Sequence, residues 1–244
     1  TGTTWGDRRT GVFEIGQFYR RFTGLDRLPR SSREWMGIPE SNLAAATNGA
    51  VFTDGPREFT RFREGLLAFY PPNVRLQKIA ARCMKIAQAG QYNYPRCTGR
   101  GELVAARMAE AEFIDAAISM VFLLNHAYKP FYKWMHRGME ELPVLGESGH
   151  RLLGDLCAER SDRDEAGQTG SGVFDARERI VEEISALLIE RLTFEGLSDA
   201  ESDFLLDHAH AVQAGIEIGR DAAVKEIDND LTGGGRFDVP GTDR

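Results

Sequence analysis

The sequence predicts an all-α protein, a bundle of five or more helices, and three observations support this fold class. Two long segments, about 73–92 and 102–126, carry apolar residues at the spacing of a helix face. Few segments show the apolar–polar alternation of strands. The chain has 244 residues, of which 42% are hydrophobic, so it is long and apolar enough to bury a sizeable core.

The N-terminal region predicts short elements at the edge of the bundle. A short strand is expected over Val12–Ile15, followed by a helix that contains Tyr19. Ser31 and Glu34 form an S-x-x-E capping box, in which the serine side chain accepts a bond from a backbone N–H of the first turn. The box predicts a short helix that carries Trp35.

Proline and glycine set the bounds of the next two helices. Pro39 suits the start of a helix over Glu40–Asn48, and Gly49 suits its end. A second helix is expected over about 57–69, because Pro71 and Pro72 follow it.

The two central helices are expected over 73–92 and 102–126, with Tyr94–Gly101 as their connection. The second is apolar almost all round in its C-terminal half, Ala116–Leu124, which is typical of a helix at the centre of a bundle. This run is too short for a membrane span, which needs about 20 residues.

Four more helices and a linker complete the expected organisation. Ser198 and Glu201 form a second capping box, which predicts the start of the last helix. The other predicted segments are helices over about 130–141, 149–159 and 173–194, a polar linker over Arg160–Gly172 and an end of the last helix near Ile227. As domains, these give 1–24 as an edge or remnant of another domain, 25–159 as the central bundle, 173–230 as C-terminal helices packed on it, and 231–244 as a flexible tail.

The net charge of −7 conceals a strong asymmetry along the chain. Residues 1–100 carry 16 Lys and Arg against 8 Asp and Glu, whereas residues 101–244 carry 14 against 29. The overall acidity makes nucleic acid an unlikely partner, but the basic half still allows a local phosphate site. Because the two halves carry opposite net charge, the halves of two copies can also attract each other. The alternative function is therefore a non-catalytic association module that forms a homodimer.

Several site types are excluded by their missing motifs. Cys83, Cys97 and Cys157 form no C-x-x-C pair, which argues against a zinc knuckle or a disulfide framework and favours a reducing, cytoplasmic compartment. The sequence contains neither a phosphate-binding G-x-x-x-x-G-K-[ST] loop nor a G-x-G-x-x-G dinucleotide motif. No metal site is predicted in this chain.

Basic residues recur on one face of the first central helix, at Arg75, Lys78, Arg82 and Lys85. Two interpretations stay open. In the first, the stripe is a solvated face or one that pairs with acidic residues of the second half. In the second, it is a phosphate-attracting, RNA-binding face.

The end of the same helix gathers amide, phenol and guanidinium groups. The candidate substrate- or nucleotide-binding residues there are Gln91, Tyr92, Asn93, Arg96 and Arg100. Amides can bind the edge of a base or sugar, and arginine binds phosphate oxygens in a fork. The alternative interpretation is an elaborate helix end held by internal hydrogen bonds.

Two further candidates lie on other predicted helices. Glu112 lies where the second central helix becomes apolar, and a carboxylate in apolar surroundings can act as a general base. A salt bridge is the alternative. Tyr132 and Lys133 belong to an aromatic segment that either packs the end of the bundle or presents an ammonium group to a phosphate.

Five short motifs rich in uncommon polar residues resemble those of the family called domain of unknown function 4037. The resemblance covers roughly residues 10–230. The motifs, in chain order, are Trp35-Met-Gly-Ile-Pro39-Glu40, Thr47-Asn48-Gly49-Ala-Val-Phe52-x-Asp54, Tyr70-Pro71, Gly90-Gln91-Tyr92-Asn93-x-x-Arg96-Cys97 and Asn125-x-x-Tyr128-x-Pro130-x-Tyr132-Lys133-Trp134.

The resemblance implies a helical region that follows a nucleotidyltransferase domain of the polymerase-beta type. It is similar to the helical second domain of antibiotic nucleotidyltransferases, which closes over the catalytic cleft and contacts the substrate. By this likeness Lys133 is the candidate for the triphosphate and Glu112 the candidate base. The implied partners are a nucleotide and a small-molecule acceptor, with Mg²⁺ and a nucleoside triphosphate bound in the intact protein.

One departure limits that likeness. Such enzymes hold two magnesium ions with an Asp-x-Asp pair shortly after a Gly-Ser, and here Gly170-Ser171 is followed only by Asp175. The sequence therefore predicts a substrate-binding region that is not catalytic alone, either a fragment or a relative without catalysis.

Overall fold

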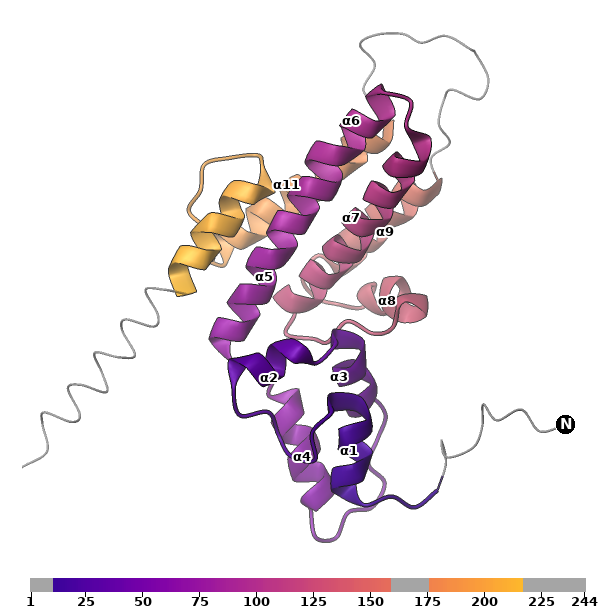
Figure 1. Ribbon diagram of the computed structural model, residues 1–244, viewed down its shortest axis with the longest axis vertical. Coiled ribbons are helices and arrows are strands. Elements are labelled where there is room, and N and C mark those ends of the chain that lie inside the picture. The colour runs from indigo at the N-terminus through magenta and orange to yellow at the C-terminus, as the bar shows by residue number, and fades with distance from the viewer. Residues whose placement is uncertain (1–10, 159–175, 217–244) are drawn as a thin grey trace, which may run out of the picture.

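The computed structural model describes residues 11–158 and 176–216, and the regular structure in these ranges is helical (Figure 1). This confirms the all-α class. The helices are α1 (Ile15–Thr23), α2 (Ser32–Gly37), α3 (Glu40–Thr47), α4 (Glu58–Leu67), α5 (Pro72–Ile86), the π-helix η1 (Ala87–Asn93), α6 (Tyr94–Gly99), α7 (Leu103–Leu124), α8 (Tyr132–Met139), α9 (Gly146–Ala158) and α11 (Ala176–Phe194), with a further helix over residues 205–216.

The helices α1 to α4 form a group of their own at one end of the long central helices (Figure 1). Tyr19 on α1 stacks on Phe62 of α4 with a centroid separation of 3.8 Å. The predicted strand over Val12–Ile15 is wrong, because residues 12–14 are irregular and Ile15 begins α1. No other described segment is a strand that could pair with it, and a lone strand leaves its backbone groups unpaired.

The Ser31–Glu34 capping box is confirmed, because the Ser31 hydroxyl accepts the backbone N–H of Glu34 at 3.3 Å. The predicted helices over 40–48 and 57–69 correspond to α3 and α4, each within two residues at its ends.

The first central helix continues past its predicted end, through α5, η1 and α6, as one rod along α7 (Figure 1). The expectation of a connection over Tyr94–Gly101 is therefore wrong for most of that segment. The Tyr94 N–H bonds to the carbonyl of Ala89, five residues back, which is the π-helix pattern. Because the hydrogen-bond register shifts at this point, Pro95, which has no N–H to donate, follows without ending the helix.

The second central helix, α7, forms the core, as predicted. All residues of Ala116–Leu124 are at most 4% exposed. α5, η1 and α6 pack along one side of α7, while α8 and α9 also contact it and α11 packs against α9 and η1. Among the described helices, none is both long and apolar enough to cross a bilayer.

The last described helix begins later than predicted. Ser198 does not cap it, because regular helix starts at residue 205. The Ser198 hydroxyl instead donates to Nδ1 of the buried His208 at 2.9 Å, and His208 Nε2 donates to the Ser202 carbonyl at 2.8 Å. The predicted linker over 160–172 and the predicted helix end near Ile227 lie outside the described residues.

We expect Gly90→Ala to lower the free energy of unfolding by about 1–3 kcal/mol, because it overpacks the contact between η1 and α7. A Cβ at Gly90 would lie 2.2 Å from Cδ2 of the fully buried Phe113. Chemical denaturation measures the change. The matched control is Gly154→Ala in α9, where a Cβ meets no atom within 4 Å.

The control should gain about 0.5–1 kcal/mol from the better helix propensity of alanine. Equal effects of the two substitutions would contradict the close contact between η1 and Phe113.

Candidate functional site

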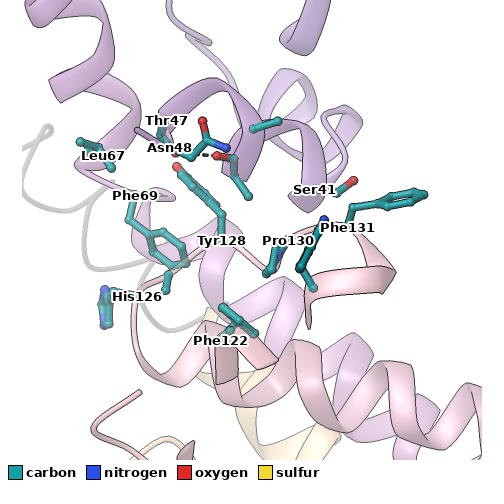
Figure 2. Close-up of a pocket in the computed structure, with 15 residues that line it drawn as sticks. Ser41, Thr47, Asn48, Leu67, Phe69, Phe122, His126, Tyr128, Pro130 and Phe131 are labelled. Carbon is teal, nitrogen blue, oxygen red and sulfur yellow. Dashed lines mark hydrogen bonds between the residues drawn. The ribbon is translucent and has the colours of Figure 1, made fainter. Parts of the chain in front are cut away.

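A cavity of about 510 Å³ lies between α3, the C-terminal end of α7 and α8 (Figure 2). Its volume is in the range of small-molecule sites, about 300–1,000 Å³. α3 and the end of α4 supply one side, and the turn after α7 and the start of α8 supply the other. The lining residues are Ser41, Ala44, Ala45, Thr47, Asn48, Leu67, Phe69, Phe122, His126, Ala127, Tyr128, Pro130, Phe131, Trp134 and Gly138.

Aromatic rings make up much of the wall, and none of the described lining residues carries an acidic, lysine or arginine side chain. Tyr128 packs between Phe69 and Tyr70, with ring centroids 5.0 and 5.2 Å away. Its hydroxyl donates to the Leu66 carbonyl at 2.7 Å, so this ring is fixed in place. The wall is therefore apolar, and a central part of it is rigid.

Two residues of the wall hold left-handed backbone conformations that non-glycine residues rarely adopt. Phe69 has φ 71° and His126 has φ 52°, and their ring centroids are 5.4 Å apart. Such conformations cost about 1–3 kcal/mol each and gather at functional sites. Burial and the nearby Arg75 lower the pKa of His126 below its ordinary value of 6.5, so its imidazole is neutral at pH 7.

A buried ionic network holds α3 against the central helices. Glu40, the first residue of α3, accepts a bond from Arg82 at 3.0 Å and from the Ser119 hydroxyl at 2.8 Å. Lys78 Nζ lies 3.7 Å from the same carboxylate. Because Glu40 and Lys78 are each only 7% exposed, this network is shielded from water and fixes the wall that α3 contributes.

The end of α3 presents Asn48 on a fixed backbone. The Arg63 guanidinium donates to the carbonyls on both sides of Asn48, at 2.6 Å to Thr47 and 2.9 Å to Gly49. Gly49 has φ 72°, a conformation that suits glycine. The Asn48 side chain lies at the edge of the cavity (Figure 2) and makes no hydrogen bond to another described residue.

The predicted contact residues of η1 and α6 lie away from this cavity. Gln91 is occupied internally, since its amide donates to Glu182 and to the Asp203 carbonyl and accepts from the Leu205 N–H. It thereby ties η1 to the start of the last described helix. This is the alternative interpretation, a helix end held by internal bonds.

Four of the predicted contacts remain on the surface near η1 and α6. Tyr92 is half exposed, and the guanidinium of Arg96 lies 4.7 Å from the centre of its ring. Asn93 and Arg100 are exposed as well. These four residues belong to η1, α6 and the residue after α6, and Figure 1 shows α6 and α8 toward opposite ends of α7.

The predicted base, Glu112, is a surface residue in the structure. Its side chain is 59% exposed, and its carboxylate lies 3.7 Å from Lys85 Nζ. This is the salt-bridge alternative rather than a carboxylate in apolar surroundings. The geometry gives Glu112 no contact with the cavity or with the other candidates.

Tyr132 and Lys133 lie on α8 beside Trp134, which lines the cavity. Both are exposed, and the Tyr132 ring packs on Phe131 with centroids 4.5 Å apart. Lys133 makes no ion pair with a described residue. These two of the predicted contacts do not line the cavity, but they are sequence neighbours of Phe131 and Trp134, which do.

The basic stripe on α5 is paired inside the molecule. Arg75 donates to the Leu123 carbonyl at 3.0 Å and to Glu195 at 3.1 Å. The other three basic side chains of the stripe face Glu40 or Glu112. Its cations are therefore engaged with this chain's own carboxylates and carbonyls.

The described residues do not fit the magnesium that the family resemblance implies. Among them, no three His, Cys, Asp or Glu side chains are grouped so that they could hold a metal ion.

The cavity was not predicted, although five of its fifteen lining residues occur in the motifs that carry the resemblance. Thr47 and Asn48 belong to one motif, and Tyr128, Pro130 and Trp134 belong to another. The sequence signal that could have predicted the site was the concentration of aromatic and amide residues in motifs far apart in the chain.

Comparison with protein families supports the resemblance. Residues 35–135 match the model of the family described as Domain of unknown function (DUF4037). That range contains all the cavity residues except Gly138. Comparisons with curated proteins and with solved structures found no match.

We expect Glu40→Gln to lower the free energy of unfolding by about 3–5 kcal/mol, because it leaves Lys78 and Arg82 without their buried counter-charge. Denaturant unfolding measures the loss. The control is Glu112→Gln, which breaks a half-exposed pair and should cost less than about 1 kcal/mol. Similar losses for the two variants would contradict the role of Glu40.

Stability should also fall as the pH is lowered through 6.5. The unfolded chain takes up a proton on His126 first, because the pKa of His126 is lowered in the folded state. His126→Asn keeps a residue that tolerates the left-handed conformation and should remove this part of the pH dependence. Urea unfolding at about pH 7.5 and 5.5, on either side of the ordinary histidine pKa, tests this. An unchanged pH dependence in the variant would refute it.

Proposed function

We propose that this chain, whose residues 35–135 belong to the DUF4037 family, is the helical substrate-binding region of a nucleotidyltransferase-like protein. In this proposal the aromatic cavity binds the uncharged organic part of the nucleotide or of the acceptor. The observation that carries it is the cavity itself, which is largely apolar, walled by rings and bordered by few polar groups, as small-molecule sites are.

The position of Lys133 next to Trp134 in α8 supports a role for its ammonium group. Lys133 is exposed next to Trp134, so a ligand whose ring enters the cavity can extend its phosphate groups toward the ammonium. Lysine binds phosphate as a point charge without needing a fixed fork geometry. We therefore keep Lys133 and Tyr132 as phosphate-side contacts and assign no ligand contact to Gln91.

The region binds and orients in this proposal, and it supplies no reacting group. Glu112 is exposed and paired, so it is a poor general base. The transfer of a nucleotidyl group from a magnesium-bound nucleoside triphosphate belongs to the separate domain that the family resemblance implies.

A homodimer remains the alternative, and exposed aromatic residues favour it. Phe131, Tyr132 and Trp134 are 53%, 63% and 58% exposed, and such patches also occur at protein interfaces. Light scattering distinguishes the two functions, because an association module forms a dimer that Trp134→Ala weakens, while a ligand-binding region does not require one.

The test of the proposed function is calorimetric titration of the chain with ATP and with adenosine. Ala45→Trp places a bulky ring on an exposed position of the cavity wall, and it should weaken both ligands at least tenfold. Lys133→Ala should weaken ATP but leave adenosine unchanged, because adenosine has no phosphate.

The control is Ala81→Trp, an exposed alanine of α5 that does not line the cavity, and it should bind both ligands as the wild type does. Binding that is unaffected by Ala45→Trp and lost with Arg96→Ala would overturn the proposal and return the site to the surface near α6.

A further inference from the structure

We propose that Asn48 is the specificity-determining residue of the cavity and that the ligand it selects is an uncharged, planar ring with adjacent hydrogen-bond donor and acceptor groups on one edge. This inference rests on the proposed function only in taking the cavity as the binding site. It assigns a ligand class that does not depend on whether the ligand is a nucleotide or an acceptor.

The charge of the surroundings favours an uncharged ring. Two cations close to the lining residues in sequence are already engaged: Arg63 binds the carbonyls of Thr47 and Gly49, and Lys129 pairs with Asp115. A third, Lys133, makes no ion pair with a described residue, but it is exposed and does not line the cavity. The imidazole of His126 is neutral, because its pKa is lowered. A charged group entering this apolar site would lose its hydration without gaining a counter-charge.

The shape of the wall favours a planar group. Phe69 and Tyr128 lie side by side in the wall, with ring centroids 5.0 Å apart, and Phe122 adds a separate ring from the end of α7 (Figure 2). Phe69 and Phe122 are at most 5% exposed, and Tyr128 is held by its bond to Leu66, so the wall cannot readily rearrange. Flat rings gain most from such walls through stacked or edge-to-face contacts.

Asn48 supplies both hydrogen-bonding roles. A carboxamide offers an N–H donor and a carbonyl acceptor side by side, and it pairs with a ring edge that offers the complementary acceptor and donor. The clamp by Arg63 holds the backbone on both sides of Asn48, while the amide itself has no partner among the described residues. The backbone on either side of Asn48 is thus fixed while its exposed amide is open to a ligand, and Arg63 is a positioning residue.

A matched series of naphthalene compounds tests the inference. The series comprises 2-naphthamide, which is planar with a donor and an acceptor; 2-acetylnaphthalene, which lacks the donor; 2-naphthoate, which is charged; and decahydro-2-naphthamide, which is not planar. Titrations followed by NMR at the indole N–H of Trp134 give the dissociation constants. We expect 2-naphthamide to bind about fivefold to tenfold tighter than 2-acetylnaphthalene, the effect of one hydrogen bond.

The variants separate specificity from a structural effect. Asn48→Ala should bring the two constants together, because 2-naphthamide loses two hydrogen bonds and 2-acetylnaphthalene loses only the one that its carbonyl accepts. Arg63→Gln should reduce the ratio of the dissociation constants of 2-acetylnaphthalene and 2-naphthamide. If another variant is unstable, Asn48→Asp replaces it, because it keeps the shape of the side chain. Gln17→Ala, which removes an exposed amide on α1, should keep the wild-type ratio.

The outcomes separate the two proposals. If the compounds bind with equal affinity, or if the preference for 2-naphthamide survives Asn48→Ala, the role of Asn48 is overturned while the cavity remains a site. If 2-naphthoate or decahydro-2-naphthamide binds best, the ligand class is overturned. If no compound in the series shifts the Trp134 signal, the cavity is not a ligand site and the proposed function fails with it.

Discussion

The buried carboxylate of Glu40 fixes the position of α3, and the site depends on that position. Glu40 lies in the first turn of α3, where the positive end of the helix dipole also favours a negative charge. Its partners Lys78, Arg82 and Ser119 belong to α5 and α7, so one carboxylate joins three helices. This junction is the buried ionic contact that ties α3, and with it one wall of the cavity, to α5 and α7.

The same kind of pairing explains the charge asymmetry of the chain. Part of the excess positive charge of the first half meets acidic residues of the second half inside one molecule, as Arg75 meets Glu195 and Lys85 meets Glu112. Within the basic stripe on α5, Arg75 and Lys85 pair with the second half, as the first interpretation expected, whereas Lys78 and Arg82 pair with Glu40 of the first half. Gln91 similarly joins η1 to Glu182, Asp203 and Leu205. Part of the polar pattern that suggested a phosphate site thus serves the packing of the bundle, while Tyr92, Asn93, Arg96 and Arg100 remain exposed.

The sequence was informative about helices whose signals are local. The apolar run Ala116–Leu124 predicted the core helix, and the Ser31–Glu34 box predicted a cap that the structure contains. The prediction from sequence failed where a contact with residues farther along the chain overrides a local signal. Pro95 follows the register shift of η1, which itself lies against Phe113, and Ser198 bonds to His208 ten residues away instead of capping a helix.

By itself, then, the sequence determined the helical class, the central helices and the family resemblance, because periodicity and short motifs are properties of neighbouring residues. Only the tertiary structure decided the site. Asn48, Phe69, His126 and Trp134 are separated by up to 86 positions, and their convergence depends on how α3 and α8 pack at the end of α7. A cavity is space left between packed elements, and no pattern along a single segment encodes where that space remains.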